Sequence, residues 1–250
     1  HVVLVTPASR DAFQARYPRQ PANKFRLIPN GCDLEDFTAV RQLDVPADDT
    51  FRIVHTGLLS IDEGWHRSPE PFFAALHQIS QDCPELAGQL QVTFTGRLPQ
   101  RYSQHVQANG LRSMVREAGF VPHDGFLRLL RQADLLLTIN YEGFHTLIPG
   151  KMYEYWAVGR APILLLDGPG AAQSLLRQYG LGYCVPPDDV AAIVQAVVTA
   201  YQERAAGRPL RINPTGIEQF DRRALTGQLA VLLDELSEPH AVGAQNARPA

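Results

Sequence analysis

The segment 149–166 constrains the fold more than any other part of the chain. It opens with a proline and a glycine, which break any preceding element, and continues with helix formers over 151–158. Gly159 suits the left-handed residue that often ends a helix, and Pro162 blocks continuation of that helix. The residues 163–166 are all apolar, as in a strand that is buried on both faces. The pattern predicts a loop, a short helix and a buried strand.

The same alternation of apolar strands and amphipathic helices runs along most of the chain. We expect strands at 51–55, 90–95, 120–121, 135–139, 163–166 and 183–185. We expect helices at 71–80, 102–117, 124–131, 151–158, 171–179 and 190–205. This order is typical of an α/β protein with a doubly wound, Rossmann-like parallel sheet, which binds ligands at the carboxyl ends of its strands. The candidate binding loops are therefore 56–70, 96–101, 121–124, 140–151 and 167–170.

A candidate phosphate site lies at the start of the helix at 151–158. Lys24 and Lys151 are the only lysines of the chain, so Lys151 is an unusual choice for this position. The first turn of a helix already favours an anion through its N–H groups and its dipole. Glu154, on the same helical face, could accept hydrogen bonds from sugar hydroxyls, and Pro149 and Gly150 would belong to the same site. The alternative is a surface Lys–Glu pair, worth roughly a few tenths of a kcal/mol.

The composition excludes several classes of protein. A net charge of −3 argues against nonspecific binding to nucleic acid, which relies on basic patches. No run approaches the ~18–20 apolar residues of a membrane span, and no secretory signal pattern is present. Three widely spaced cysteines, Cys32, Cys83 and Cys184, suit a reducing compartment and do not have zinc-ligand spacing. We expect a cytoplasmic protein, free or at the inner face of the membrane, with at most peripheral membrane association.

Residues 1–37 begin with a buried-strand pattern that has no lead-in. We expect a strand, a helix and a strand at 2–6, 9–17 and 24–28. Because strands without partners are not stable, we expect this segment to be the end of a truncated N-terminal domain, together with a link between domains. The alternative is that it packs onto the following domain as an extension. The predicted division is 1–37, a domain at 38–237 with a final helix at 221–236, and a disordered tail at 238–250.

Four segments carry motifs that occur together in one family. Residues 149–165 read P-G-K-M-Y-E-Y-W-A-V-G-R-A-P-I-L-L, and 27–37 read L-I-P-N-G-C-D-L-E-D-F. Residues 119–124 read G-F-V-P-H-D, followed by A-D-L-L-L at 133–137, and 182–189 read G-Y-C-V-P-P-D-D. In order and spacing these motifs resemble those of retaining GT-B glycosyltransferases. The chain is most similar to the C-terminal, donor-binding domain of such enzymes.

The resemblance implies an enzyme that transfers a sugar, with retention, from a nucleotide diphosphate sugar to a glycan or lipid-linked acceptor. It implies attack on the front face, electrostatic stabilisation of the leaving diphosphate, and no metal or other cofactor. A GT-B site lies between two domains, so we expect turnover to need the missing N-terminal domain. Two alternatives stay open: a nucleotide-sugar-binding module without turnover, and a GT-B-fold sugar-nucleotide epimerase with acid and base carboxylates.

The first candidate loop holds possible ligands of the diphosphate. Gly57 follows a strand and lets a ligand approach the backbone. Arg67 precedes a Ser-Pro helix start and could clamp a diphosphate with two N–H groups. Relatives carry an arginine where this chain has Leu58, so the resemblance leaves the phosphate ligands open. A solvated loop position is the alternative for Arg67.

The loop after the strand at 135–139 holds candidates for the sugar-facing wall: Glu142, His145 and Thr146. In the family an E-x7-E motif is common, and its second Glu, which contacts ribose, aligns with Glu154. Thr146 stands where the first Glu is expected, whereas Glu142 lies further upstream in a Glu-Gly-Phe sequence. Either the loop carries a four-residue insertion, or Glu142 is unrelated to the motif. If Glu142 were a nucleophile, a double displacement would follow.

Two further loops are candidates for contacts with the nucleobase. Arg97 follows the second strand of the domain and lies beside the base or a phosphate, or is a surface charge. Val121 and Pro122 resemble the place where relatives contact the base through their backbone. No GxGxxG, P-loop or G-x-S-x-G motif occurs in the sequence. Their absence disfavours nicotinamide dehydrogenases, nucleoside triphosphatases and serine hydrolases.

Overall fold

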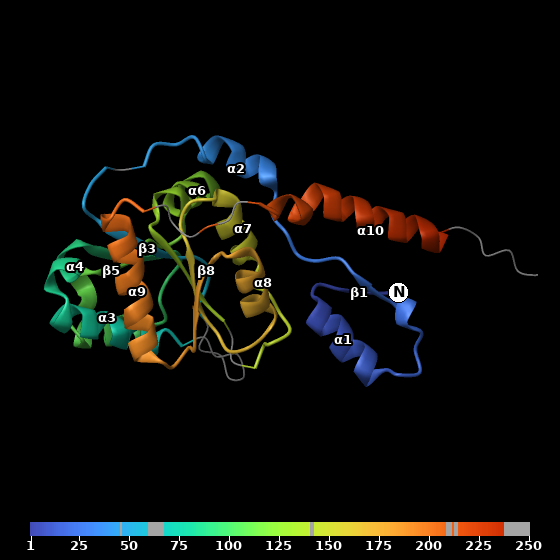
Figure 1. Ribbon diagram of the computed structural model, residues 1–250, viewed down its shortest axis with the longest axis horizontal. Helices are drawn as coiled ribbons and strands as arrows, with labels where there is room; N and C mark the ends of the chain where they lie inside the picture. The colour runs from blue at the N-terminus through green and yellow to red at the C-terminus, as the bar shows by residue number, and fades with distance from the viewer. Residues whose placement is uncertain (46, 60–67, 141–142, 209–211, 213–214, 238–250) are drawn as a thin grey trace, which may run out of the picture.

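The computed structural model describes residues 1–45, 47–59, 68–140, 143–208, 212 and 215–237. Its main body is a parallel sheet of β3 (Phe51–His55), β4 (Leu90–Phe94), β5 (Val115–Glu117), β6 (Leu135–Ile139), β7 (Ile163–Leu166) and β8 (Gly182–Val185). The strand order is β5-β4-β3-β6-β7-β8. Figure 1 labels β3, β5 and β8 of this sheet. The order therefore reverses between β3 and β6. This confirms the doubly wound sheet and places its ligand-binding switch point at the ends of these two strands.

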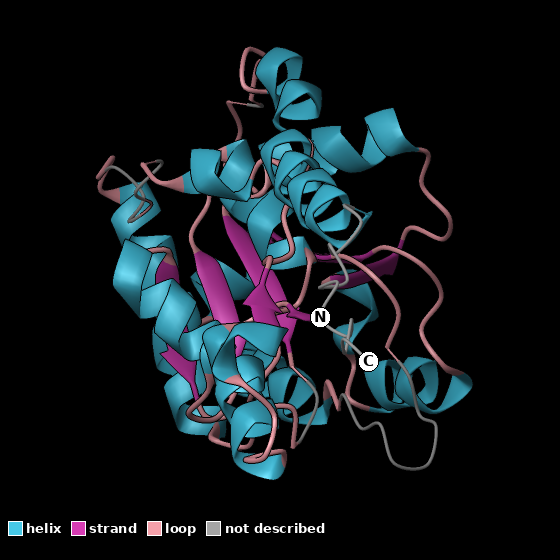
Figure 2. Ribbon diagram, turned by 90° about the vertical axis from the view of Figure 1, so that its right-hand side faces the viewer, coloured by secondary structure: helices cyan, strands magenta, loops and turns pink. Residues whose placement is uncertain are grey.

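Helices cover both faces of this sheet, as the side view also shows (Figure 2). One apolar cluster joins the sheet to α3 (Glu70–Asp82), α4 (Pro84–Gln89), α5 (Gln100–Ala108) and α9 (Val190–Ala205). The other joins it to α2 (Leu34–Val40), α6 (His123–Gln132), α7 (Lys151–Val158) and α8 (Ala171–Tyr179). Every residue of β6 and β7 is buried, which is why these strands are apolar at every position except Thr138.

One part of the predicted element order is wrong. The helix expected at 102–117 ends at Ala108, because Gly110 has a φ of +68° and closes the turn in the left-handed region. A short 3-10 helix, Leu111–Ser113, then leads into β5. The strand of this unit is β5, and the segment 120–121, expected as a strand, lies in the loop before α6. The short helices α2 and α4 were not predicted.

The N-terminal residues form a unit of their own. β1 (Val2–Leu4) and β2 (Phe25–Leu27) pair in parallel as a separate sheet, with α1 (Pro7–Arg16) between them in sequence. The final helix, α10 (Arg222–Ser237), runs from the main body past this unit (Figure 1). Arg26 Nη1 of this unit lies 3.6 Å from Glu235 Oε2 of α10. The division of the chain at residue 37 stays a prediction, and the expected tail at 238–250 lies outside the described residues. None of the described helices is long and apolar enough to cross a membrane.

Candidate functional site

Lys151 opens α7 and reaches the carboxyl end of β3. Its Nζ donates a hydrogen bond to the carbonyl oxygen of Thr56 and lies 3.2 Å from Nε2 of His55. His55 is the last residue of β3 and is fully buried. Because an ammonium group can only donate, the contact favours a neutral imidazole that accepts at Nε2. The positive charge of Lys151 is thus held at the switch point between β3 and β6.

The backbone of Gly57 lies close to this ammonium group. Its φ is +89°, a backbone conformation that residues with a side chain rarely adopt. A Cβ at this position would lie 3.4 Å from Lys151 Nζ and 3.7 Å from its Cε. The structure therefore brings together the two residues that the sequence placed in different loops. An anion can approach the Lys151 charge along the bare backbone of Gly57.

Gly57→Ala should weaken binding of inorganic diphosphate, because the added methyl group narrows the approach to Lys151. It should also cost about 1–2 kcal/mol of unfolding free energy through backbone strain. Gly110→Ala is the matched control, since Gly110 has a φ of +68° and an added Cβ there would meet nothing within 4 Å. Calorimetric titration and urea unfolding of both variants should show a similar loss of stability, with weaker binding in Gly57→Ala alone. Equal binding by the two variants would argue against an anion path along Gly57.

Tyr155 fixes α7 against the strand ends. Its hydroxyl accepts a hydrogen bond from Thr56 N at 2.9 Å, lies 2.9 Å from Thr56 Oγ1, and donates to Leu137 O at 3.3 Å. The side chain is fully buried. These bonds hold the Thr56 peptide in place, and the carbonyl of that residue in turn positions Lys151. Tyr155 was not among the residues predicted from the sequence, because its role depends on β3 and β6 lying side by side.

Glu154 is half-buried on the same helix, close to Arg222 and His123. Burial raises the pKa of its carboxyl group, and these two residues together with Lys151 oppose that shift. Among the described residues, Glu154 has no hydrogen-bond or ion-pair partner, and no Lys151–Glu154 ion pair forms. The structure thus differs from the surface pair that was the alternative for these two residues.

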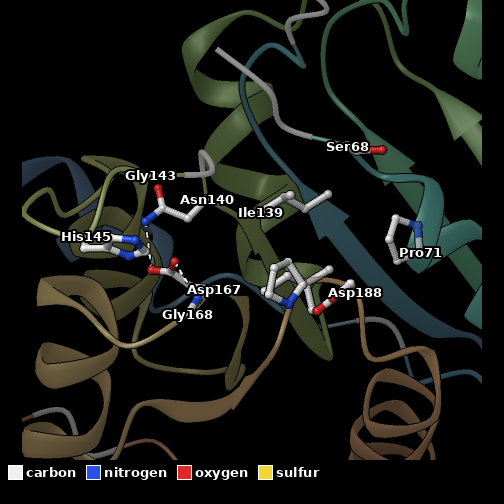
Figure 3. A pocket seen from close by; sticks show the side chains of 11 residues that line it. Ser68, Pro71, Ile139, Asn140, Gly143, His145, Asp167, Gly168 and Asp188 are labelled. Atoms are coloured by element: carbon white, nitrogen blue, oxygen red, sulfur yellow. Dashed lines mark hydrogen bonds between the residues drawn. The ribbon is translucent and has the colours of Figure 1, made fainter. Parts of the chain in front are cut away.

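A pocket of about 510 Å³ opens at the ends of β6, β7 and β8, facing the start of α3. Asp167, directly after β7, is buried there, and its Oδ2 accepts from Asn140 Nδ2 at 2.8 Å. Its Oδ1 accepts from the backbone N–H of Gly168 at 2.8 Å. Figure 3 shows His145 beside this pair and Pro71 across the pocket. Burial raises the pKa of Asp167, whereas these hydrogen bonds and His145 act to lower it.

This pocket presents a carboxylate, an amide and an imidazole, which suit hydrogen bonding to the hydroxyl groups of a sugar. The loops 140–151 and 167–170 were predicted to bind ligands, but Asn140 and Asp167 were not singled out. A signal was available, since each is the polar residue directly after a strand that consists mainly of apolar residues. In a parallel sheet such residues meet at the edge where ligands bind.

A smaller groove of about 150 Å³ lies at the ends of β3, β4 and β5. Gly57, Gly96 and Val121 line it, together with two unusually exposed apolar side chains, Phe120 at 93% and Leu58 at 73% exposure. Gly57 lines this groove and also lies next to Lys151 Nζ, so the groove is adjacent to the ammonium group. An exposed aromatic ring beside open backbone suits a flat, heteroaromatic group.

The other predicted site residues are placed as follows. The carbonyl oxygen of Thr146 accepts a hydrogen bond from Thr6 Oγ1, the N-cap hydroxyl of α1. Gly150 is the N-cap of α7 and follows Pro149. Arg97 and Pro122 are exposed. Arg67 and Glu142 lie outside the described residues, so their assignments stay predictions. Within the described ranges, no three His, Cys, Asp or Glu side chains are grouped to hold a metal ion.

The comparisons with known proteins give a family match and a set of solved structures with a similar fold. The family model described as glycosyl transferases group 1 matches residues 51–203. A sucrose-phosphate synthase from Thermosynechococcus elongatus is similar over 94% of this chain and 58% of its own, with 25% identity and a TM-score of 0.71. HepE of Anabaena, solved in complex with UDP and glucose, is similar over 94% of this chain and 63% of its own, with 20% identity and a TM-score of 0.68. Among curated protein sequences, none is similar enough to count as a match.

The chain thus spans 58% to 63% of the length of these two solved structures. The matched region runs from β3 to α9 and contains Gly57, Lys151, Glu154 and the Asp167 pocket. The family match covers more than half of the chain, and the solved structures have the same fold. The chain belongs to the group 1 family of glycosyl transferases.

Proposed function

We propose that the chain binds a nucleotide diphosphate sugar and takes part in transferring its sugar, with retention, to a glycan or lipid-linked acceptor. The observation that carries the proposal is the Lys151 ammonium group, held by Thr56 at the switch point beside Gly57. The start of α7 adds the positive end of a helix dipole, which favours a diphosphate. That HepE was solved with UDP and glucose supports this class of donor.

The three features around the switch point suit the three parts of such a donor. We assign the diphosphate to Lys151, the base to the groove with Phe120 and Leu58, and the sugar to the pocket with Asp167. Gly57 supports this order, because it lies between the ammonium group and the groove. The diphosphate then meets a charged group, the base meets an apolar surface, and the sugar meets hydrogen-bonding groups.

The chemistry we assign to this chain is mainly electrostatic. In front-face attack, the bond from the anomeric carbon to the diphosphate oxygen breaks, and the acceptor oxygen bonds to the same face. The acceptor proton passes to the leaving diphosphate. Lys151 and the α7 dipole stabilise the charge that develops on that group, and a dry site strengthens this effect. Neither a protein nucleophile nor a metal ion is needed for this route.

Glu154→Gln should weaken binding of UDP and GDP by about 1.5–3 kcal/mol, the range for hydrogen bonds to a charged group, because we assign Glu154 to the ribose hydroxyls. Binding of inorganic diphosphate should stay nearly unchanged. Calorimetric titration with the nucleotides and with diphosphate gives the comparison. An equal loss for both kinds of ligand would refute the ribose assignment.

Glu154→Gln should weaken nucleotide binding but stabilise the folded chain at neutral pH. Burial raises the pKa of Glu154, so the folded state favours the protonated carboxyl. The stability that Glu154 contributes is then fully present at acidic pH and is lost as the pH rises through its folded-state pKa. Glu154→Gln should therefore unfold at a higher temperature than the wild type at neutral pH, and this difference should shrink near pH 4. Thermal unfolding at both pH values measures it. A lower unfolding temperature at neutral pH would mean that Glu154 has a structural role.

A sugar-nucleotide epimerase is the second candidate, and one observation favours it. Such an enzyme needs acid and base groups, and Asp167 has a raised pKa beside His145 in the polar pocket. The two functions differ in a simple assay. Epimerisation through proton abstraction incorporates deuterium into the sugar of a nucleotide sugar in D2O without any acceptor. Transfer requires an acceptor and leaves the carbon-bound hydrogens of the sugar in place.

A further inference from the structure

A second large cavity lies between α1 and α8 and has no role in the donor site described above. Its volume is about 610 Å³, within the range typical of small-molecule sites. Val5 and Leu27 of the N-terminal unit form one wall, and Leu175 of α8 forms the other. Tyr153 and Phe220, whose ring centroids are 4.9 Å apart, complete the lining with aromatic surface. The cavity therefore joins the N-terminal unit to the main body.

His145 connects this cavity to the pocket at the strand ends, because it lines both. Its carbonyl oxygen accepts from Ala171 N, at the start of α8, at 2.7 Å. A Cβ at Gly170 would lie 2.7 Å from the same oxygen, so this contact requires glycine. The next residue, Thr146, is bonded to Thr6 at the start of α1. The backbone carbonyl groups of His145 and Thr146 are thus hydrogen-bonded to the two walls of the cavity.

The charge and polarity of the lining residues determine which chemical class of ligand the cavity can bind. Among the described residues that line it there is no lysine or arginine, and Asp11 is the single charged side chain. An anionic ligand such as a phosphorylated sugar would therefore meet no positive partner. The apolar and aromatic walls instead favour an uncharged ligand group. The transfer of such a group from water is favourable in proportion to the apolar area that becomes buried.

We propose that this cavity binds the apolar group of the acceptor, an alkyl chain or an unsubstituted ring, while the reacting hydroxyl lies near His145. The inference rests on the proposed function, since the ligand is an acceptor only if the donor sugar occupies the pocket beyond His145. It narrows the acceptor to a molecule in which an uncharged apolar group is attached close to the hydroxyl that receives the sugar.

Two glucosides that share one sugar test the proposal on the whole chain. n-Hexyl β-D-glucopyranoside should bind at least about tenfold more tightly than methyl β-D-glucopyranoside, because the cavity buries the added methylene groups. Calorimetric titration measures both dissociation constants. UDP is titrated in parallel, so that the donor site is assessed on the same protein.

Ser174→Trp should abolish the preference for the hexyl group, because Ser174 lines the cavity from α8 and the indole ring fills it. Ser237→Trp is the matched control. Each serine hydroxyl donates to the carbonyl oxygen four residues earlier in the sequence, at 2.8 Å for Ser174 and 2.9 Å for Ser237. Ser237 lies outside the lining. Ala8→Trp fills the cavity from the opposite wall and serves if Ser174→Trp does not fold.

Loss of the preference in Ser174→Trp or Ala8→Trp, with its retention in Ser237→Trp, is the result we expect. Equal binding of the two glucosides, no binding of the hexyl compound, or a preference that survives both filling variants would overturn the inference. These outcomes are independent of the donor site. If UDP binds and the hexyl preference is missing, the proposed function stands without this acceptor class. If the preference is present and UDP does not bind, the proposed donor site fails and the cavity keeps its apolar ligand.

Discussion

Lys151→Ala should weaken binding of UDP and GDP by about 1.5–3 kcal/mol, or roughly 10- to 150-fold in dissociation constant. The reason is the position of the ammonium group, which Thr56 holds beside the backbone of Gly57 at the switch point. Unlike Glu154→Gln, this variant should lose affinity for inorganic diphosphate as well, because we assign the Lys151 charge to the phosphates. Calorimetric titration with UDP and with diphosphate measures both effects.

Lys24→Ala is the matched control, since Lys24 is the second of two lysines and bonds to Gln20 in the N-terminal unit. It removes the same charge away from the switch point and should leave nucleotide binding unchanged. Circular dichroism should show that both variants are folded. If Lys151→Ala binds UDP as tightly as Lys24→Ala does, the diphosphate is bound elsewhere.

Asp134→Ala should lower the unfolding free energy by about 3–5 kcal/mol, because it removes one partner of a buried ion-pair network. Asp134 is 1% exposed, and its Oδ1 lies 3.2 Å from Arg160 Nη2 and 3.0 Å from Arg204 Nε. Its Oδ2 accepts from the backbone N–H of Arg52 at 2.9 Å. The substitution leaves two arginines without this carboxylate. Urea unfolding measures the loss.

Asp48→Ala provides the comparison for that prediction. Asp48 also pairs with an arginine, Arg52, at 2.6 Å, but its side chain is 45% exposed. Exposed ion pairs contribute little to stability, so this variant should lose much less than Asp134→Ala. UDP binding should be unchanged in both variants, because Asp134 precedes β6 at the end of the sheet opposite the switch point. Equal losses of stability would show that burial does not set the strength of the network.

The sequence predicted the central strands better than the edge of the sheet. β3, β6 and β7 have the predicted bounds, because buried parallel strands are rich in apolar residues. β5 lies at the edge, and only its first residue, Val115, is buried, whereas Arg116 and Glu117 are exposed. Three residues with this pattern read equally well as the end of an amphipathic helix, which is the structure that was predicted for them.

In the candidate site, the sequence predicted residues with a local signal and missed residues whose partners are distant in the sequence. Lys151 and Gly57 were predicted, because a helix start and a glycine after a strand are local features of the sequence. Asn140, Asp167 and Tyr155 were not, because their partners come from other strands and from positions 18 to 99 residues away. The division of the chain at residue 37 stays a prediction.

The most direct test of the account is calorimetric titration of the wild-type chain with UDP and GDP in the presence of EDTA. The site at Lys151 and Gly57 predicts binding of at least one of them, with a dissociation constant in the micromolar to millimolar range, roughly 4–8 kcal/mol. Addition of magnesium should not be required. No binding of either nucleotide, or binding that appears only after a divalent metal is added, would contradict the proposed donor site.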